Sequence, residues 1–369
     1  MTSSNLVFRH TGRTSHHTLR IRGVTLNYRD TIVANGTYPF PLKDDLAPCS
    51  DGAGVVVELG ADVKTLLLGD RVIANFDVNN LDGLTPGMKR VSLGGNVDGV
   101  LRQYIALPAQ VLTKVPEESD VSFVQMASLV ASGVTAWNAL FGVQPLKAGQ
   151  TVLFQGTGGV SIIGLQLAKA AGATTIITSS SDEKLKFVQE KFGADHVINY
   201  KTHPDWAAVA NQITNGRGVD FVLENGGSGT IVQSIEAITV GGVIAVIGFL
   251  SPAKQEEMPD LTVLLLGKGC IVRGISLGSQ QQLRDLVQFV SHHHIQPFVQ
   301  KTFGFSRNEV LEAFDYLQAG RHIGKVGIKI KHEANHEGQL VAETYAQEFY
   351  FYSSHSKVNL AIKFIPNGQ

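Results

Sequence analysis

Three glycines in the segment QGTGGVS could bind a phosphate group through their backbone. Gly156, Gly158 and Gly159 follow the apolar run TVLF and precede the amphipathic segment VSIIGLQLAKAAG. This order predicts a strand, a tight turn and a helix. In such a unit the glycines permit the turn and let the backbone approach a pyrophosphate, which binds at the N-terminus of the helix. We therefore expect a dinucleotide to bind at these glycines and at Val160.

One residue departs from the usual pattern G-x-G-x-x-G. Ser161 stands at its third glycine, the position that lets the helix pack closely against the strand. A small side chain is tolerable there, and Gly164 one turn later can relieve crowding. The alternative is a glycine-rich turn that binds nothing. The further strand–helix units that follow the turn favour a nucleotide site.

The end of the next predicted strand indicates which dinucleotide binds. An NAD site usually has Asp or Glu there to bind the ribose 2′-hydroxyl. The segment TTIITSSSDEKL instead has Ser179 and Ser180, which leave room and donors for a 2′-phosphate, and Lys184 follows one helical turn later. Asp182 and Glu183 argue against this choice, but acids are also common in the first turn of a helix. NADPH is the predicted cofactor.

The elements that must position this turn form two kinds of pattern. From about Leu19 to Pro116 short β-like runs are separated by Gly, Pro, Asn and Asp. From about Asp120 apolar strands alternate with amphipathic helices, which indicates a parallel sheet covered on both faces. The predicted fold class is α/β, with a doubly wound nucleotide-binding domain inserted into a mostly-β domain. The predicted parts are 1–118 for the first part of the mostly-β domain, 119–268 for the nucleotide-binding domain, 269–330 for the return to the mostly-β domain and 331–369 for an atypical tail.

Composition narrows the class of protein. The chain has 369 residues, is 43% hydrophobic and 17% charged, and has a net charge of −1 without blocks of like charge. These values are typical of a globular protein and give no reason to expect nucleic acid or an anionic membrane as a partner. The longest apolar run, 237–250, is too short to span a bilayer.

Two features bear on the compartment. The two cysteines, Cys49 and Cys270, have no partner at a metal-binding spacing, which suits a reducing compartment and predicts a cytoplasmic protein. The first thirty residues contain several arginines and no acid before Asp30, so mitochondrial import is the alternative.

Several motifs occur in an order that is similar to one superfamily. They are GVTLNYRDTIVANGTYPFP, CSDGAGVVVELG, ASGVTAWNAL, GTGGVSIIGLQLAKAAGA, GADHVINY and GRHIGKVGIKI. Together they resemble the medium-chain dehydrogenase/reductase superfamily, in the branch of zinc-independent quinone oxidoreductase-like and enoyl reductase-like proteins. The resemblance implies a GroES-like mostly-β catalytic domain, a Rossmann nucleotide-binding domain and a homodimer that pairs through the sheet edge at 269–278. It covers about Leu19 to Ile330.

The resemblance also shows where this chain departs from the zinc enzymes of the superfamily. Those enzymes have cysteine where this chain has Asn27, a His-Glu pair at Ser50 and Asp51, and a second cysteine near Ala131. A catalytic zinc needs three such ligands, so no metal is expected. The histidines at 292–294 are interpreted as an exposed helix end.

By resemblance, two groups of residues form the site. The catalytic group faces the nicotinamide or the substrate, with Tyr38 as proton donor, Tyr28 as the alternate donor and Asp30 orienting its neighbours; it consists of Asn27, Tyr28, Asp30 and Tyr38. The cofactor group beyond the glycine turn and its serines consists of Thr135, Tyr200, Asn225, Gly248, Phe249, Leu277 and Lys325. Tyr38 could instead only pack before Pro39, and Lys325 could be a solvated lysine.

The predicted function is NADPH-dependent reduction of quinones or activated C=C bonds in enones and enals, a small-molecule reaction that proceeds by hydride transfer without zinc. One alternative is an enoyl-thioester reductase of the mitochondrial type. The other is a protein that binds NADPH without catalysis. The tail at 331–369 has no counterpart in the superfamily and is expected to dock weakly or stay unfolded, without a role in catalysis.

Overall fold

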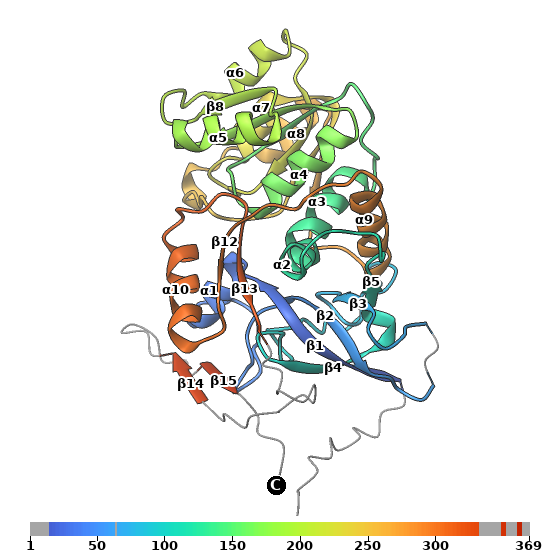
Figure 1. Cartoon of the computed structure of the whole chain (residues 1–369). Coiled ribbons are helices and arrows are strands. Elements are labelled where there is room, and N and C mark those ends of the chain that lie inside the picture. The colour runs from blue at the N-terminus through green and yellow to red at the C-terminus, as the bar shows by residue number, and fades with distance from the viewer. Residues whose placement is uncertain (1–14, 63–64, 332–347, 352–359, 364–369) are drawn as a thin grey trace, which may run out of the picture.

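The computed structural model describes residues 15–62, 65–331, 348–351 and 360–363, and these form two domains (Figure 1). The predicted α/β fold class is confirmed by the two large sheets, one mostly antiparallel and one parallel. The N-terminal segment at 1–14 and most of the tail lie outside the described residues. The predictions of import and of tail docking therefore stay predictions.

The catalytic domain is built around a seven-stranded sheet in the order β12-β13-β1-β2-β3-β5, with β4 paired to β1. Its strands are β1 (His16–Thr25), β2 (Asp51–Glu58), β3 (Arg71–Ala74), β4 (Tyr104–Pro108), β5 (Leu112–Lys114), β12 (Val299–Phe303) and β13 (Lys325–Lys329). Alternate residues of β1 are buried, because one face of the strand lies on the core of this domain. The sequence runs read as strands between Leu19 and Pro116 are therefore confirmed.

The nucleotide-binding domain contains a parallel sheet of six strands in the order β8-β7-β6-β9-β10-β11. These strands are β6 (Thr151–Phe154), β7 (Thr174–Ser179), β8 (His196–Asn199), β9 (Val219–Glu224), β10 (Ile238–Val246) and β11 (Ile271–Gly274). Numbered in chain order, they follow the pattern 3-2-1-4-5-6 of the doubly wound dinucleotide fold. Ligands of such sheets bind where the order reverses, which here is the carboxyl end between β6 and β9.

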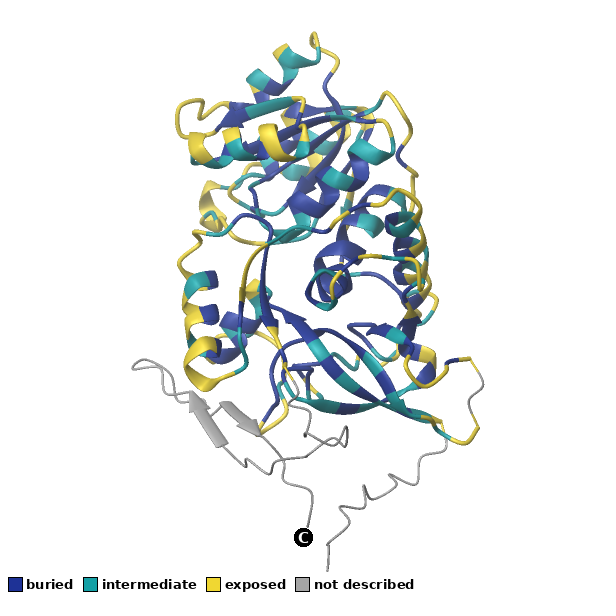
Figure 2. Cartoon of the chain, viewed as in Figure 1, coloured by how far each residue is buried: buried dark blue, intermediate teal, exposed yellow. Residues whose placement is uncertain are grey.

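Both faces of this sheet are buried (Figure 2). In β6, Val152 and Phe154 pack into a core shared with α4, while Leu153 between them packs with α6 and α7 on the other face. The same alternation explains why the strands read as nearly continuous apolar runs. The helices are α1 (Tyr28–Ala34), α2 (Phe123–Ser128), α3 (Val134–Phe141), α4 (Gly159–Ala170), α5 (Asp182–Phe192), α6 (Trp206–Ile213), α7 (Ile231–Ala237), α8 (Leu261–Lys268), α9 (Gln280–His292) and α10 (Arg307–Gln318).

A buried π-helical turn, η2 (Leu129–Gly133), links α2 to α3 where the two domains meet. Such turns are rare and are frequent at functional sites, because the extra residue shifts the side chains that follow. Two short 3-10 segments complete the helical elements, η1 (Ala109–Val111) and η3 (Gln255–Glu257).

The structure differs from the predicted boundary between residues 268 and 269. β11 pairs with β10 as the edge strand of the parallel sheet, and α9 packs against α3, so the chain returns to the catalytic domain only at β12. The expected return at 269 was wrong, because an edge strand carries the same short β-like pattern in either domain. In the tail, β14 (Glu348–Phe351) and β15 (Leu360–Lys363) pair antiparallel.

No described helix is long and apolar enough to cross a membrane.

Candidate functional site

The glycine turn between β6 and α4 leaves open space for a ligand. Gly156 has a φ of +74°, a left-handed conformation that favours glycine. A Cβ atom added at Gly156 or at Gly158 would meet no protein atom within 4 Å. Gly158 is the N-cap of α4, and no side chain caps this end of the helix. The turn therefore fits a pyrophosphate, which would accept hydrogen bonds from the first turn of α4.

Gly159 has a different role from its two neighbours. A Cβ atom here would lie 2.6 Å from Cδ of Lys325 and 2.6 Å from Oγ of Ser132 in the π-helical turn. The glycine thus lets the catalytic domain approach the turn. The backbone N–H of Gly324 also donates to the carbonyl of Thr157 over 2.9 Å, which holds the start of β13 against the turn.

Ser161 makes the hydrogen bonds that explain its presence at the third glycine position. Its hydroxyl donates to the carbonyl of Gln155 at 2.7 Å and accepts from Nδ2 of Asn225 at 3.1 Å. Asn225 Nδ2 also donates to the Gln155 carbonyl at 2.9 Å. Ser161 therefore connects the end of β6 to the end of β9, the two strands that flank the predicted ligand position.

A buried carboxylate, Glu224, orders the loop after β9. It accepts hydrogen bonds from Nε2 of Gln155 at 2.6 Å and from the backbone N–H groups of Gly226 and Gly227 at 2.8 and 2.9 Å. The hydroxyl of Ser234 in α7 donates to it as well. Nothing in the sequence pattern singled out Glu224 or Gln155, because buried glutamate is recognisable only with its donors in place.

The predicted 2′-phosphate region lies at the end of β7. Ser179 is buried and its hydroxyl accepts from the N–H of Ser181, whereas Ser180 is half-buried. Asp182, the acid that argued for NADH, accepts a hydrogen bond from Nδ2 of Asn199 at 2.8 Å. Its carboxylate is thus engaged with β8.

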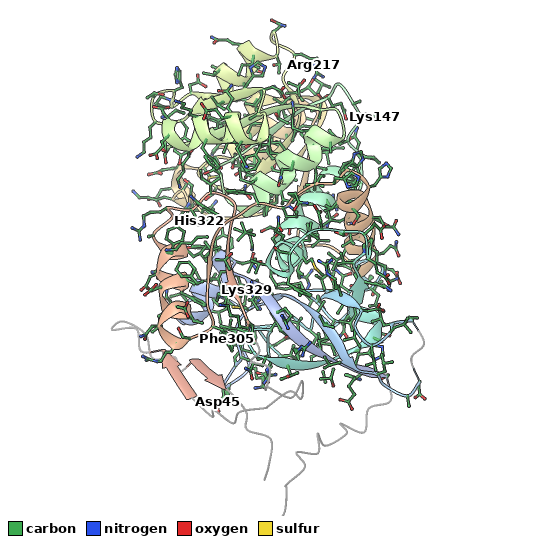
Figure 3. The ribbon with its side chains drawn as sticks, in the orientation of Figure 1. Asp45, Lys147, Arg217, Phe305, His322 and Lys329 are labelled. Atoms are coloured by element: carbon green, nitrogen blue, oxygen red, sulfur yellow. The ribbon has the colours of Figure 1, made fainter. Side chains whose placement is uncertain are left out.

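Lys184 has partners that the sequence did not predict. Its ammonium donates to the carbonyls of Gly320 and His322, at 2.7 and 3.1 Å, in the turn before β13. Burial lowers the pKa of Lys184. Lys184 therefore ties the nucleotide-binding domain to the catalytic domain, at the junction where His322 is labelled in Figure 3.

His322 lies at this junction and was not among the predicted site residues. Burial lowers its pKa to about 4, and the charges of Lys184 and Lys325 act in the same direction. Its imidazole is therefore neutral at pH 7, and its Nδ1 atom is buried without a hydrogen-bond partner in the described part of the chain.

Between the domains, three polar side chains from distant segments meet. The ammonium of Lys325 donates to Oδ1 of Asn27 at 2.7 Å and to Oδ2 of Asp51 at 3.0 Å. Asp51 is fully buried and also accepts from the hydroxyls of Thr25 and Ser50. Lys325 is buried as well, which rules out the interpretation as a solvated lysine. Asp51 was not among the predicted catalytic or cofactor-binding residues.

Asp30 and Arg29 support this cluster from α1. Asp30 accepts the backbone N–H of Asn27 at 2.8 Å, as expected of a residue that orients its neighbours. Burial raises the pKa of Asp30 to about 6, although Arg29 acts in the opposite direction. The Arg29 guanidinium lies 5.4 Å from the ring centroid of Tyr38 and donates to the carbonyl of Leu93. Tyr38 is half-buried against the catalytic core, while Tyr28 is exposed.

The other predicted cofactor residues lie on several elements of the nucleotide-binding domain. Thr135 is buried in α3, and Tyr200 follows β8 with an exposed ring. Gly248 and Phe249 follow β10, and a Cβ atom on Gly248 would lie 2.5 Å from the carbonyl oxygen of Asn225, so the two loops are in contact. Leu277 has a φ of +62° and accepts from Nδ2 of Asn138.

The zinc positions of the superfamily do not fit a zinc ion here. Asn27, Ser50 and Ala131 offer neither thiolate nor imidazole, and Asp51 is already paired with Lys325. A zinc ion would have to displace the ammonium from that carboxylate. Within the ranges that the structure describes, no group of three or more His, Cys, Asp or Glu residues could hold a metal ion.

Comparison with known proteins matches both domains. Residues 14–117 match the alcohol dehydrogenase GroES-like domain, and residues 159–292 match the family described as zinc-binding dehydrogenase. A zinc-type alcohol dehydrogenase-like protein of Schizosaccharomyces pombe is 43% identical over 318 residues, which cover 85% of this chain and 90% of the relative.

Two solved structures extend the comparison. A structure described as a putative alcohol dehydrogenase from Sinorhizobium meliloti is 38% identical, with a TM-score of 0.79 over 86% of this chain and 91% of the other. A quinone oxidoreductase from Pseudomonas syringae is 25% identical, with a TM-score of 0.69 over 88% and 94%. These proteins are oxidoreductases, so the comparisons favour an enzyme over a protein that only binds NADPH.

Proposed function

Because the chain belongs to the medium-chain dehydrogenase/reductase superfamily, whose members are oxidoreductases with a nicotinamide cofactor, we propose that it reduces quinones or activated C=C bonds with NADPH and without zinc. The proposal rests on the residues at the superfamily's zinc positions, where the hydrogen-bond donors are the Lys325 ammonium and the Asn27 amide. Asp51 is held there by Lys325, and the neighbouring positions are Asn27 and Ala131. The site offers hydrogen-bond donors in place of a Lewis acid.

This donor set favours conjugated acceptors over alcohols. Oxidation of a simple alcohol requires loss of the hydroxyl proton, which a metal ion assists by lowering its pKa. A quinone or enone is already electrophilic at carbon, and hydride addition places the new charge on an oxygen that hydrogen-bond donors can stabilise. The similarity to a quinone oxidoreductase supports the same class.

The chain's own residues would divide the work as follows. The turn at Gly156 and Gly158 binds the pyrophosphate, and the bound cofactor supplies the hydride. Asn27 binds the substrate oxygen, and Tyr38 supplies the proton that completes the reduction. Arg29 holds the Tyr38 ring through a cation–π contact.

The choice of NADPH rests on the end of β7. Ser180 is half-buried where an NAD enzyme usually has a free carboxylate, and the nearest acid, Asp182, is engaged by Asn199. The Lys184 ammonium adds positive charge to this region, although its hydrogen bonds go to the 320–322 turn. A second candidate, the enoyl-thioester reductase, is favoured by the placement of Tyr38 beside Arg29 and shares the same hydride chemistry.

The test is to assay the purified protein with a panel of substrates, with the absorbance of NADPH as the readout of turnover. Quinones and enones should oxidise NADPH, whereas saturated ketones should not, and turnover should survive exhaustive chelation with no stoichiometric zinc in elemental analysis. An enoyl-thioester in the panel separates the second candidate. Alcohol oxidation that is lost on chelation and restored by zinc would overturn the proposal.

A pair of glycine variants tests whether the turn binds NADPH. Gly158→Ala places a Cβ atom in the open space beside the turn and should weaken NADPH binding at least tenfold without unfolding the protein. Gly267→Ala in α8 also meets no protein atom within 4 Å and should leave NADPH binding unchanged.

A further inference from the structure

The contact between Lys325 and Asn27 determines how the asparagine amide is turned. An ammonium group only donates hydrogen bonds, so the amide oxygen of Asn27 and not its NH2 group must face Lys325. The distance between Nζ and Oδ1 is 2.7 Å, and the side chain of Lys325 is only 6% exposed. The NH2 group therefore points away from the lysine. It is buried and finds no acceptor among the described residues.

A buried N–H group without an acceptor lowers the stability of the protein, so such a group indicates that a ligand supplies the acceptor when it binds. Asn27 stands at a zinc-ligand position of the superfamily, where the metal enzymes bind the substrate oxygen. Its backbone N–H donates to Asp30, which fixes the backbone of Asn27 at the start of α1. A carbonyl oxygen of the substrate would satisfy the free NH2 group.

The Lys325 ammonium, on the oxygen side of the Asn27 amide, is also fixed in position. Asp51 accepts from Lys325 and from the hydroxyls of Thr25 and Ser50, so the carboxylate holds the ammonium in one place. Lys325 packs against Gly159 of the cofactor turn, which places this cation at the junction of the two domains. A positive charge on the oxygen side of an amide polarises it and strengthens its N–H groups as donors.

We propose that Lys325 takes the place of the superfamily's metal ion as a built-in cation, and that it turns and polarises Asn27 so that the amide NH2 donates to the carbonyl oxygen of the substrate. This inference rests on the proposed function. Asn27 is then the catalytic residue that contacts the substrate, and Lys325 and Asp51 are positioning residues. Hydride addition leaves negative charge on that oxygen, and loss of one such donor typically lowers kcat by about 10²-fold.

A probe that needs no turnover tests the contact. 4-(Dimethylamino)cinnamaldehyde is an enal whose absorption moves to longer wavelength when its carbonyl oxygen accepts a hydrogen bond. With saturating NADP⁺, which has no hydride to donate, the wild-type protein should shift the absorption of the bound probe to longer wavelength. Fluorescence titration measures NADP⁺ affinity in parallel.

Three variants separate the roles. Asn27→Asp keeps an oxygen toward Lys325 and replaces the donor, so it should lose the wavelength shift and about 10²-fold in kcat, with NADP⁺ affinity within threefold. Lys325→Arg keeps the cation and should retain the shift. Lys325→Met leaves Asp51 buried and unpaired, so the double variant Lys325→Met with Asp51→Asn is used instead, and it should lose the shift.

The outcomes are distinguishable. If the shift survives in Asn27→Asp, the amide is not the donor and the inference is wrong. If the double variant keeps the shift but loses more than tenfold in NADP⁺ affinity, Lys325 serves only as a cofactor contact. A wild-type shift without turnover of any quinone or enone would refute the proposed function while supporting the inference, and turnover without a shift would do the reverse.

Discussion

Ser161 stands where the dinucleotide pattern has its third glycine, and we expect that replacing it with glycine destabilises the nucleotide-binding domain. Ser161→Gly removes a hydrogen bond to the Gln155 carbonyl and one from Asn225. Asn225 still donates to the Gln155 carbonyl, so this carbonyl keeps a partner, and the loss of the two neutral hydrogen bonds should cost only ~1 kcal/mol in total. The greater flexibility of glycine in a helix adds ~0.5 kcal/mol relative to serine.

The matched variant Ser161→Ala separates these two contributions. It loses the same hydrogen bonds but favours the helix, so its destabilisation should be ~0.5 to 1 kcal/mol, against ~1.5 to 2 kcal/mol for glycine. Both tryptophans of the chain, Trp137 and Trp206, lie in the nucleotide-binding domain. Urea unfolding followed by their fluorescence therefore reports the stability of this domain.

The refuting result is a glycine variant with an unchanged or higher unfolding midpoint. It would mean that the hydroxyl contributes nothing and that position 161 is only a site of relaxed packing. Titration with NADPH adds a second readout, because Asn225 belongs to the loop that follows β9 and is predicted to contact the cofactor. Loss of the Ser161 bond should weaken NADPH binding by a few-fold, and tighter binding would contradict the argument.

Three further predictions follow from the same contacts. Ser180→Asp should weaken NADPH binding and strengthen NADH binding. Lys184→Met should weaken the binding of both cofactors because it releases the 320–322 turn, and should weaken NADPH more because it also removes positive charge from the predicted 2′-phosphate region. The dissociation constants of both cofactors test this, and a wild type that prefers NADH refutes the serine argument. Asp30 has a folded pKa of about 6 against the ordinary 3.8, so the folded state binds more protons between these values and the Asp30 contribution to stability falls as pH rises through them. Asp30→Asn should remove this trend and gain up to ~3 kcal/mol relative to wild type from pH 4 to 6, measured as unfolding free energies; a constant difference would show that the pKa is not raised. Light scattering should give a homodimer that pairs through β11, where Ile271 and Val272 are 44% and 39% exposed, and lysine at both positions should give monomers, while a monomeric wild type would contradict the pairing.

Helices and strands are predictable from the sequence where the apolar residues repeat with the period of the element. β6 and α4 were predicted because one is an apolar run and the other is amphipathic, with glycines between them. Two features gave no such signal. The apolar segment of α8 lacks a polar face, and no residue of it is buried. α1 has only seven residues and follows a strand, so its sequence was read as part of the β-like region.

Site residues are predictable from the sequence when residues close to them in the chain determine their role. The glycines of the turn belong to one short motif, and motif spacing is enough to name them. Lys184 shows the limit. It lies where a 2′-phosphate contact is expected, yet its ammonium is hydrogen-bonded to carbonyls that are 136 and 138 positions away. Nothing local to a lysine tells which acceptor will reach it, because the acceptor is supplied by the packing of the other domain.

The same reasoning explains why the sequence could show the loss of the zinc ligands and could not show what replaced them. A ligand set is a matter of residue type, so the sequence alone shows that Asn27, Ser50 and Ala131 lack the cysteine and histidine ligands of the zinc enzymes. The replacement depends on Lys325 reaching Asp51 across 274 positions, and the lysine gains this partner only when β13 docks beside the glycine turn. Burial then makes the pairing obligatory, since neither charge is tolerable alone in that place. If the proposed role of Lys325 holds, a cation stays at this site while its chemical identity changes, and the contact that carries the proposal exists only in the folded chain.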